Sequence, residues 1–475
     1  MRPDVGEPAP FVYLSRMLPV PSLQDFRALL KLALPMVVVQ VGLMMMGVVD
    51  TIIVGHVSAT ELAAAALGNL YYFGLTMLGM GTLMAIDPIV SQAFGARDEA
   101  AIARGLQRGI VLALIISVPV ALMCLPAAPI LRALRQPPEV IPRAAGFALM
   151  SAPSVPAFFV WLVLRLGLQS MKRMRPVLAT MIVANLVNAG LNWVFVFGNL
   201  GAPAMGAVGS ALGSTIGRYC MVTMLLALSW GNLRQYLRPW RAESFQTAPL
   251  LRMLAIGLPI GVQISLEFGA FAVIALLAGW FGAEAMAGHQ IAINFASLTF
   301  MVPMGVASAA AVLVGHAVGA NDPAHARRVA STALACGVAF MSLTAIGMLA
   351  LPGVIAHVYT SAPGVAAVAA TLIPIAGVFQ VFDGLQVVAA GILRGVGDTR
   401  APMVINVLAF WMVGMPVSLW LGFRMHGGVV GLWWGFVAGL AAVATLLLLR
   451  VRHRMRGSFE RVKVDHPPAP EPLVP

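Results

Sequence analysis

The chain has 475 residues, of which 60% are hydrophobic and 10% are charged, and its mean hydropathy is +0.90. A soluble domain has about 25% charged residues, so this composition excludes a soluble globular protein and predicts an integral membrane protein. The formal net charge of +12 does not indicate nucleic-acid binding, because the basic residues gather at the ends of apolar segments and in the tail.

Twelve apolar runs follow one another along the chain, separated by charged or Gly- and Pro-rich breaks. A helix needs about 20 residues to cross the hydrocarbon core, and each run reaches that length. We therefore predict an all-α integral membrane protein with twelve transmembrane helices. Their expected ranges are 28–54, 62–93, 105–126, 142–165, 177–198, 206–229, 251–280, 286–315, 329–351, 366–393, 402–422 and 429–450.

The distribution of basic residues predicts the orientation. An even number of spans places both termini on one side, and all but five of the 30 Lys and Arg residues then fall on that side. Cytoplasmic loops carry an excess of Lys and Arg, so we expect both termini in the cytoplasm. The exceptions are Arg132, Arg135, Arg143 and Arg424 on the outer side and Arg218 within a segment.

The two halves of the chain repeat each other. A shift of 224 residues aligns Pro35 with Pro259, and SQAFGARD with VGHAVGAND. Six spans per repeat place both repeats the same way up, which predicts two six-helix lobes related by a pseudo-two-fold axis along the membrane normal, as in parallel-repeat transporters. The expected domains are a cytoplasmic segment 1–25, an N-lobe 26–230, a cytoplasmic linker 231–249, a C-lobe 250–452 and a basic, then Pro-rich tail 453–475.

Four of the 18 acidic residues lie well inside apolar segments: Asp50, Asp87, Glu267 and Asp383. A charge at the centre of a membrane-spanning helix costs at least about 2.5 to 3.5 kcal/mol, so such residues usually mark ion or substrate pathways. Glu267 and Asp383 lie near the middle of the seventh and tenth segments. We expect them to share a site in the C-lobe that binds a proton or, through oxygen ligands, Na⁺.

The two remaining acids have weaker signals. Asp50 ends the first apolar run nearer the outer face, where it serves either coupling or helix capping. Asp87 precedes Pro88 in the inner third of the second segment, where a helix break would give it a local N-cap role.

Polar, aromatic and thioether side chains accompany the acids. Asparagines four residues apart inside hydrocarbon either hydrogen-bond between helices or line a cleft. Aromatic faces and flexible thioethers suit a cleft that accepts apolar cations, although packing also accounts for them. The candidate cleft residues are Asn188, Asn192, Phe271, Phe379, Met46 and Met301.

Several chemistries have no signal in this sequence. None of the three lysines follows a glycine, so there is no phosphate-binding GxxxxGK loop and no built-in ATPase. The apolar segments contain no HExxH motif and no recognisable set of nucleophile and base. We expect a carrier rather than an enzyme, with no cofactor.

Long stretches of the chain resemble the multidrug and toxic-compound extrusion (MATE) family, most closely its NorM-like bacterial branch. The resemblance rests on LPMVVVQVGLMMMGVVDTIIVGHVSATELAAAALG, LPIGVQISLEFGAFAVIALLAGWFGAEAMAGHQIAINFASLTFMVPMG, LNWVFVFG and LRGVGDTRAPM, and it covers about residues 26–452. It implies a secondary active antiporter that exports organic cations and amphipathic drugs in exchange for Na⁺ or H⁺ by alternating access. It also implies a monomer in contact with membrane lipid in the bacterial inner membrane, with no nucleic-acid partner.

The resemblance assigns the family's functional residues to positions in this chain. The first-helix aspartate falls on Asp50, the seventh-helix glutamate on Glu267 and the tenth-helix aspartate on Asp383, and the fifth-helix asparagines fall on Asn188 and Asn192.

Two positions depart from the family pattern, and two other functions compete with antiport. Phe379 stands where an aromatic hydroxyl is expected, which removes a possible ligand from a Na⁺ site at Glu267 and Asp383. Asp87 stands where NorM-like chains often have an uncharged residue, while eukaryotic relatives carry an acid nearby, so the resemblance makes Asp87 a candidate for a further proton or cation site. A flippase of lipid-linked saccharides would favour a cationic cleft over an acidic one, and an ion channel would usually repeat charged rings by oligomeric symmetry.

Overall fold

The computed structural model describes residues 22–465, and these residues form helices joined by short turns. Residues 1–21 and 466–475, which include most of the predicted N-terminal segment and the Pro-rich end of the tail, lie outside the described range. The α-helices are α2 Leu23–Gly55, α3 Ala59–Leu83, α4 Ile86–Gly95, α5 Glu99–Met123, α6 Ala127–Ala133, α7 Ile141–Ser151, α8 Ser154–Ser170, α9 Met174–Phe197, α10 Gly206–Leu237, α11 Thr247–Gly279, α12 Ala283–Gly319, α13 Pro323–Ala350, α14 Pro352–Tyr359, α15 Pro363–Val396, α16 Arg400–Asn406, α17 Met415–Leu419 and α18 Gly428–Arg456.

The number of candidate spans agrees with the sequence. Within residues 22–465, eleven helical stretches are long and apolar enough to cross a membrane. Helices α7 and α8 meet the same criteria only as a pair bent by 50° at its break, and they bring the number to twelve when the pair counts as one broken span. Pro153 stands at this break, where its missing N–H and its ring prevent a continuous helix. The prediction of an all-α protein with twelve spans is confirmed.

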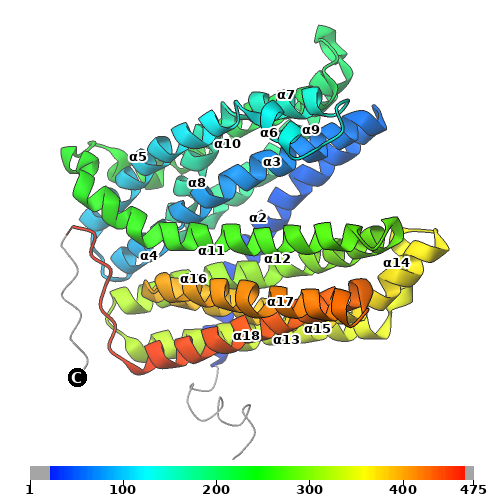
Figure 1. Ribbon diagram of the computed structural model, residues 1–475. Helices are drawn as coiled ribbons and strands as arrows, with labels where there is room; N and C mark the ends of the chain where they lie inside the picture. Colours follow the sequence, from blue (N-terminus) through cyan, green and yellow to red (C-terminus); the bar gives the residue numbers. More distant parts are fainter. Residues whose placement is uncertain (1–21, 466–475) are drawn as a thin grey trace, which may run out of the picture. The chain divides into compact units, whose positions relative to one another are not determined.

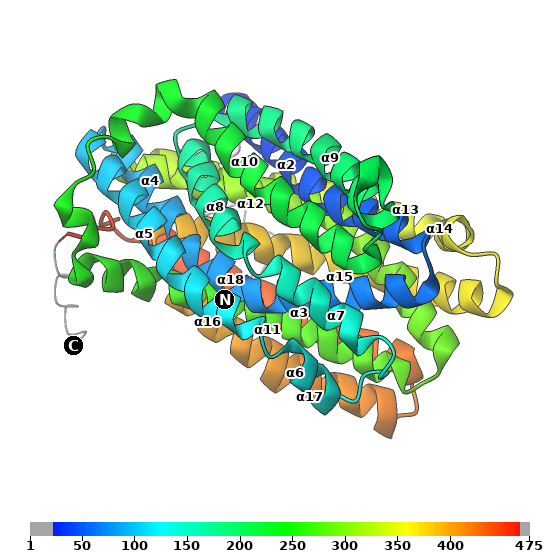
Figure 2. The same cartoon turned by 90° about the horizontal axis from the view of Figure 1, so that it is seen from above.

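The described residues divide into two compact units. The C-unit holds 22–34, 273–401 and 407–461, and the N-unit holds 35–272, 402–406 and 462–465. In the C-unit, α15 packs against α12, α13 and α18 (Figure 1). In the N-unit, α10 packs against α9, α7, α8 and α5 (Figure 2).

Helix α10 is longer than the apolar pattern indicated. Residues 231–249 were expected to form a linker, yet α10 continues to Leu237 and α11 begins at Thr247. A helix can outlast its apolar run because backbone hydrogen bonds and polar side chains sustain it beyond the hydrocarbon core. The connection between α10 and α11 contains a short 3₁₀ turn, Ala242–Phe245.

The internal repeat is visible at single residues. Arg97 and Asn321, which are 224 positions apart, both adopt a left-handed backbone conformation, with φ of 57° and 55°. The residue after each of them, Asp98 or Asp322, caps the next helix by accepting a hydrogen bond at 2.9 Å from a backbone N–H three residues on. The shared sequence pattern therefore produces the same turn and the same N-cap twice.

Two arginines at equivalent positions of the two repeats each contact one end of the described chain. Arg328 in α13 lies 3.3 Å from Asp25 at the start of α2. Arg104 in α5, 224 positions earlier, lies 2.9 Å from Asp465 in the C-terminal tail. The equivalent arginines of the two repeats therefore each pair with a carboxylate from one end of the chain.

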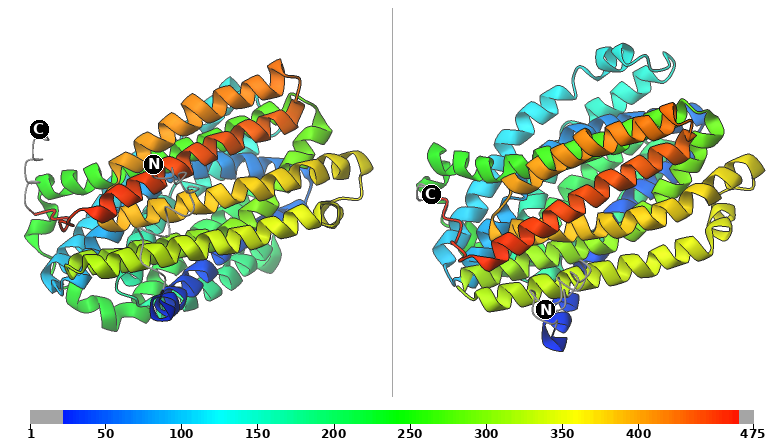
Figure 3. Two further views of the ribbon diagram at one scale, coloured as in Figure 1. Left: turned by 90° about the horizontal axis from the view of Figure 1, so that it is seen from below. Right: turned by 60° about the horizontal axis from the view of Figure 1, so that its bottom comes forward.

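The tail docks on the N-unit after it leaves α18 (Figure 3). The Val462 N–H donates to Gln92 Oε1 at 2.7 Å, and Val464 is buried. Asp465 also lies 2.6 Å from Arg108, whose side chain is only 2% exposed. Burial alone would raise the pKa of Asp465, but the hydrogen bonds and charges of Arg108 and Arg104 outweigh it and hold this pKa below its usual value.

Glycines allow a very close approach of α3 and α11 inside the N-unit. A Cβ on Gly81 would lie 2.5 Å from Gly261 Cα, and a Cβ on Gly257 would lie 1.9 Å from Thr82 O. No larger residue fits at these positions without moving the backbones apart. The contact lies near the end of α3 and in the first half of α11.

We predict that the Asp465 carboxylate holds the tail in place. The change Asp465→Asn should speed amide hydrogen exchange at Val462, because the tail then loses its ionic contacts with Arg104 and Arg108. Because the pKa of Asp465 is depressed, the carboxylate stays ionised above pH 3.8 and docking is lost only as pH falls through the lower, folded-state pKa. Protection in the wild type should therefore be equal at about pH 6 and 8 after correction for intrinsic exchange.

Glu460→Gln is the matched control, since Glu460 lies outside this contact and its loss should leave exchange at Val462 unchanged. Equal exchange in Asp465→Asn and the wild type would show that the carboxylate does not hold the tail.

Candidate functional site

The best-defined polar cluster in the membrane region surrounds Asp50 in α2. Asn192 Nδ2 of α9 donates to one carboxylate oxygen of Asp50 at 2.8 Å, and Ser214 Oγ of α10 donates to the other at 3.1 Å. Asn188 Nδ2 donates to Ser214 Oγ at 3.2 Å, so the four side chains form one connected network. Both asparagines are fully buried. The structure thus brings together three residues that the sequence singled out.

Two oxygen atoms of this cluster remain without a hydrogen-bond donor. Among the described residues, Asn188 Oδ1 and Asn192 Oδ1 are buried and have no partner. A buried carbonyl oxygen without a donor costs about 1–3 kcal/mol, so such atoms call for an explanation. Amide and carboxylate oxygens are also the ligands that hard cations prefer. Because these two oxygen atoms accept no hydrogen bond, the cluster can bind a cation or a proton there without breaking one.

Close helix packing places this cluster. A Cβ on Gly209 of α10 would lie 2.3 Å from Phe195 O of α9, so only glycine permits this approach. Asn188 and Asn192 are one turn apart and therefore lie on the same face of α9. Ser214 was not identified from the sequence, although it stands four residues after Ser210 and four before Arg218, along one face of α10.

Arg218, for which the sequence indicated no role, lies beside this network. Its guanidinium donates to Ser154 Oγ at 2.6 Å and lies over the ring of Tyr72, 4.6 Å from the centroid, and over the ring of Phe158, at 5.2 Å. The charge of Arg218 also acts on Asp50. Aromatic faces and a hydroxyl therefore stabilise a cation within the N-unit and near the acid.

Asp87 is fully buried in the first turn of α4. The N-cap position of α4 is Ala85, so the predicted capping role does not fall on Asp87. Arg165 in α8 interacts electrostatically with Asp87, and it also donates to Gln40 Oε1 at 3.2 Å. Asp87 therefore has a cationic neighbour that the sequence did not identify. Its predicted role as a further proton or cation site stays a prediction.

Glu267 lies in the N-unit part of α11 and is half-buried. Its neighbour Phe268 packs edge-on against Phe73 of α3, with ring centroids 6.3 Å apart. Phe271, one turn later, and Met46, one turn before Asp50, are also half-buried. Asp383 belongs to the C-unit, so the shared Glu267 and Asp383 site stays a prediction.

Asp383 is 6% exposed in α15 and accepts a hydrogen bond from Gln386 Nε2 at 3.2 Å. One turn earlier, Gln380 joins three helices of the C-unit. It accepts from Thr299 of α12 at 2.7 Å and donates to Thr344 of α13 at 2.6 Å. These bonds fix the face of α15 that carries the acid.

Phe379 packs inside the C-unit, where it is 1% exposed. Its ring lies against Trp433 and Phe436 of α18, with centroids 5.6 Å and 5.4 Å away. Met301 in α12 is half-buried. The predicted cleft roles of Phe379 and Met301 stay predictions.

Known proteins match almost the whole chain. The MatE family model matches residues 35–194 and 259–420, and both matches begin at the prolines that the 224-residue repeat aligns. The probable multidrug resistance protein NorM of Mesorhizobium japonicum is 36% identical over 445 residues, which cover 91% of this chain and 95% of that protein. The multidrug resistance protein MdtK of Yersinia pseudotuberculosis is 35% identical over 438 residues, which cover 90% and 95%.

Solved structures share the fold at lower sequence identity. The eukaryotic MATE transporter AtDTX14 superposes with a TM-score of 0.82 at 21% identity, covering 91% of this chain and 98% of that one. The Vibrio cholerae MATE transporter VcmN in its bent form gives 0.81 at 20% identity, with 91% and 97% covered. A Pyrococcus furiosus transporter of the MOP superfamily, described as having a binding pocket of reverse polarity, gives 0.81 at 18% identity, with 91% and 96% covered.

We predict that Arg165 compensates a buried charge on Asp87. The change Arg165→Gln should lower the free energy of unfolding by about 1–3 kcal/mol, because it removes the cation that interacts with buried Asp87 and the hydrogen bond to Gln40. The double change Arg165→Gln with Asp87→Asn should recover most of that loss. Thermal unfolding of the purified proteins in detergent gives the double-mutant cycle.

Arg175→Gln, at an exposed arginine of α9, is the control and should change stability little. If the costs of Arg165→Gln and Asp87→Asn simply add, the two residues do not stabilise each other and the prediction is wrong.

Proposed function

The chain belongs to the MATE family of multidrug efflux transporters, and from this premise we propose that it is a secondary active antiporter. It exports organic cations and other amphipathic drugs in exchange for Na⁺ or H⁺, by alternating access. It works as a monomer in the bacterial inner membrane, with both termini in the cytoplasm, and it performs no covalent chemistry on its substrate.

The observation that carries this proposal is the Asp50 cluster. A carboxylate lies beside two buried amide oxygens that have no donor, and the donors on the carboxylate come from Asn192 and Ser214. The carboxylate and amide oxygens of this cluster can together bind one small cation or one proton. It supports a site that is filled in one stage of a transport cycle and empty in another.

Glu267 and Asp383 are the other proposed coupling groups. Each is a single carboxylate on a long apolar helix, α11 and α15, and Asp383 is almost fully buried. A buried carboxylate favours its protonated or cation-bound form, because desolvation penalises the bare charge. Binding of an ion at Glu267 or Asp383 therefore stabilises the conformation that buries the carboxylate relative to a conformation that exposes it.

Coupling requires that the ion and the drug prefer opposite conformations. A ligand that binds both conformations equally shifts no population, however tightly it binds. We propose that the drug binds an inward-facing state and that cation binding at Asp50, Glu267 and Asp383 favours the outward-facing state, from which the drug leaves.

The glycine contact between α3 and α11 supports a gate in this cycle. Gly81 lies near the end of α3, and Gly257 and Gly261 lie in the half of α11 that begins at the side predicted to be cytoplasmic. Closing the cytoplasmic side brings the two backbones into contact, and an inward-facing state must separate them.

We predict that Asp50→Asn, Glu267→Gln and Asp383→Asn each lower ion-driven transport by at least about tenfold, because each removes an ionisable coupling group. The measurement is uptake of a fluorescent organic cation into proteoliposomes, with Na⁺ and pH gradients imposed separately. The gradient that drives uptake in the wild type identifies the coupling ion.

Asp322→Asn is the control for this series. Asparagine caps a helix as well as aspartate does, so this variant should transport normally. Normal gradient-driven transport by Glu267→Gln or Asp50→Asn would remove that residue from the mechanism.

We also predict that Gly261→Leu slows turnover while drug binding persists. A side chain at this position would lie 2.4 Å or less from the α3 backbone, so the gate could not close. Gly74→Leu is the control, because a side chain at Gly74 of α3 meets open space. Transport by Gly261→Leu at the wild-type rate would show that this contact is not part of the cycle.

A further inference from the structure

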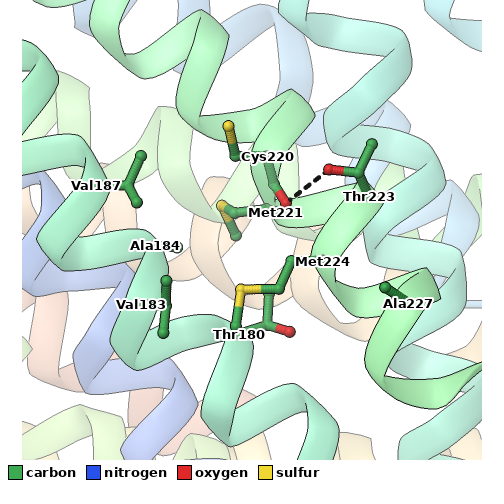
Figure 4. Close-up of a pocket in the computed structure, with 9 residues that line it drawn as sticks. All are labelled: Thr180, Val183, Ala184, Val187, Cys220, Met221, Thr223, Met224 and Ala227. Carbon is green, nitrogen blue, oxygen red and sulfur yellow. Dashed lines mark hydrogen bonds between the residues drawn. The ribbon is translucent and has the colours of Figure 1, made fainter.

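A groove of about 380 Å³ lies between α9 and α10 in the N-unit. Figure 4 shows the nine residues that line it, which come from both helices. Thr180, Ala184 and Met221 are almost fully buried and form its floor. Cys220 and Ala227 are exposed and lie at its rim.

The groove opens on an apolar face. Ile182 and Leu186 of α9 are 59% and 69% exposed, and Leu228 of α10 is 48% exposed. Both helices are candidate membrane spans, so exposed apolar side chains on them suit contact with acyl chains rather than with water. The groove has the size and the lining of a site for one such chain.

One end of the groove is basic. Arg234 follows Ala227 by seven residues in α10, so it lies two helical turns, or about 10 Å, from the groove on the same helix face. Arg173 stands seven residues before Thr180, directly before α9 begins at Met174. Arg238 is nearby in the sequence, and its guanidinium lies 5.4 Å from the centroid of Trp230. Among the described residues, none of these three arginines forms an ion pair with an acid. The charge of Arg173 acts on Tyr236, on which Glu99 acts as well.

The floor of the groove carries a hydroxyl group without a partner. Thr180 is 0% exposed, and its Oγ1 forms no hydrogen bond with any described residue. A threonine inside a helix usually satisfies its hydroxyl by donating to a carbonyl one turn earlier. Thr180 Oγ1 instead lies without a partner beneath a groove that is almost wholly apolar.

We propose that this groove binds an anionic phospholipid of the cytoplasmic leaflet. One acyl chain lies along the groove, and the phosphate contacts Arg173 and Arg234. Basic pockets between transmembrane helices at the cytoplasmic side suit anionic headgroups. A transported organic cation is a poor occupant, because the arginines repel it. The inference does not depend on what the protein transports.

The test uses the full-length protein in vesicles of equal phosphatidylglycerol and phosphatidylcholine, followed by mild detergent extraction and native mass spectrometry of the retained lipid. The wild type should retain phosphatidylglycerol in preference. Arg173→Gln with Arg234→Gln should lower that retention by about tenfold, because two phosphate contacts are lost. Arg132→Gln with Arg135→Gln, at exposed arginines predicted to lie on the outer side, should leave retention unchanged.

A second variant separates the groove from the charges. Ala227→Phe fills the groove and keeps both arginines, so it should also lower retention of phosphatidylglycerol. If the double arginine variant does not fold, this variant tests the proposal by itself. Three results would overturn the proposal: equal retention of both lipids by the wild type, unchanged retention in Ala227→Phe, or displacement of the lipid by a fluorescent organic cation.

Discussion

One carboxylate in an apolar span, Asp50, determines which polar groups the neighbouring helices of the N-unit must supply. Asp50 cannot keep its charge or its proton there without partners, and Asn192 and Ser214 supply them from α9 and α10. Both donors reach it because Gly209 lets α10 approach the backbone of α9 closely. The same helices then place Arg218 among aromatic rings within the field of the acid. Local packing and electrostatics therefore specify a single arrangement.

The two repeats share structural features but not their intramembrane acids. Turns, N-caps and the arginines that contact the two chain ends recur at a spacing of 224 residues, but the intramembrane acids do not. The position equivalent to Asp50 is Ile274, which is 1% exposed, and the position equivalent to Glu267 is Leu43. The two halves share turns and N-caps, whereas each carries its own ionisable groups.

Sequence patterns predicted what depends on composition and on position along one helix. Twelve spans follow from apolar length, and Asn188 and Asn192 stood out because amides are rare in hydrocarbon. Ser214 and Arg165 were missed because their roles depend on which helix faces meet, and a hydroxyl or a cation near a helix end gives no such signal. Docking of the tail was also missed, since residues 457–465 have no periodicity and their contacts lie more than 200 residues away in the chain.

The central claim is that cation binding at the Asp50 cluster opposes drug binding, and linkage makes this effect reciprocal. The most direct test measures the dissociation constant of a fluorescent organic cation for the purified protein while Na⁺ and pH are varied in turn. The account predicts that Na⁺ or acid weakens drug binding in the wild type and has much less effect in Asp50→Asn. Drug affinity in the wild type that is independent of both Na⁺ and pH would contradict the account.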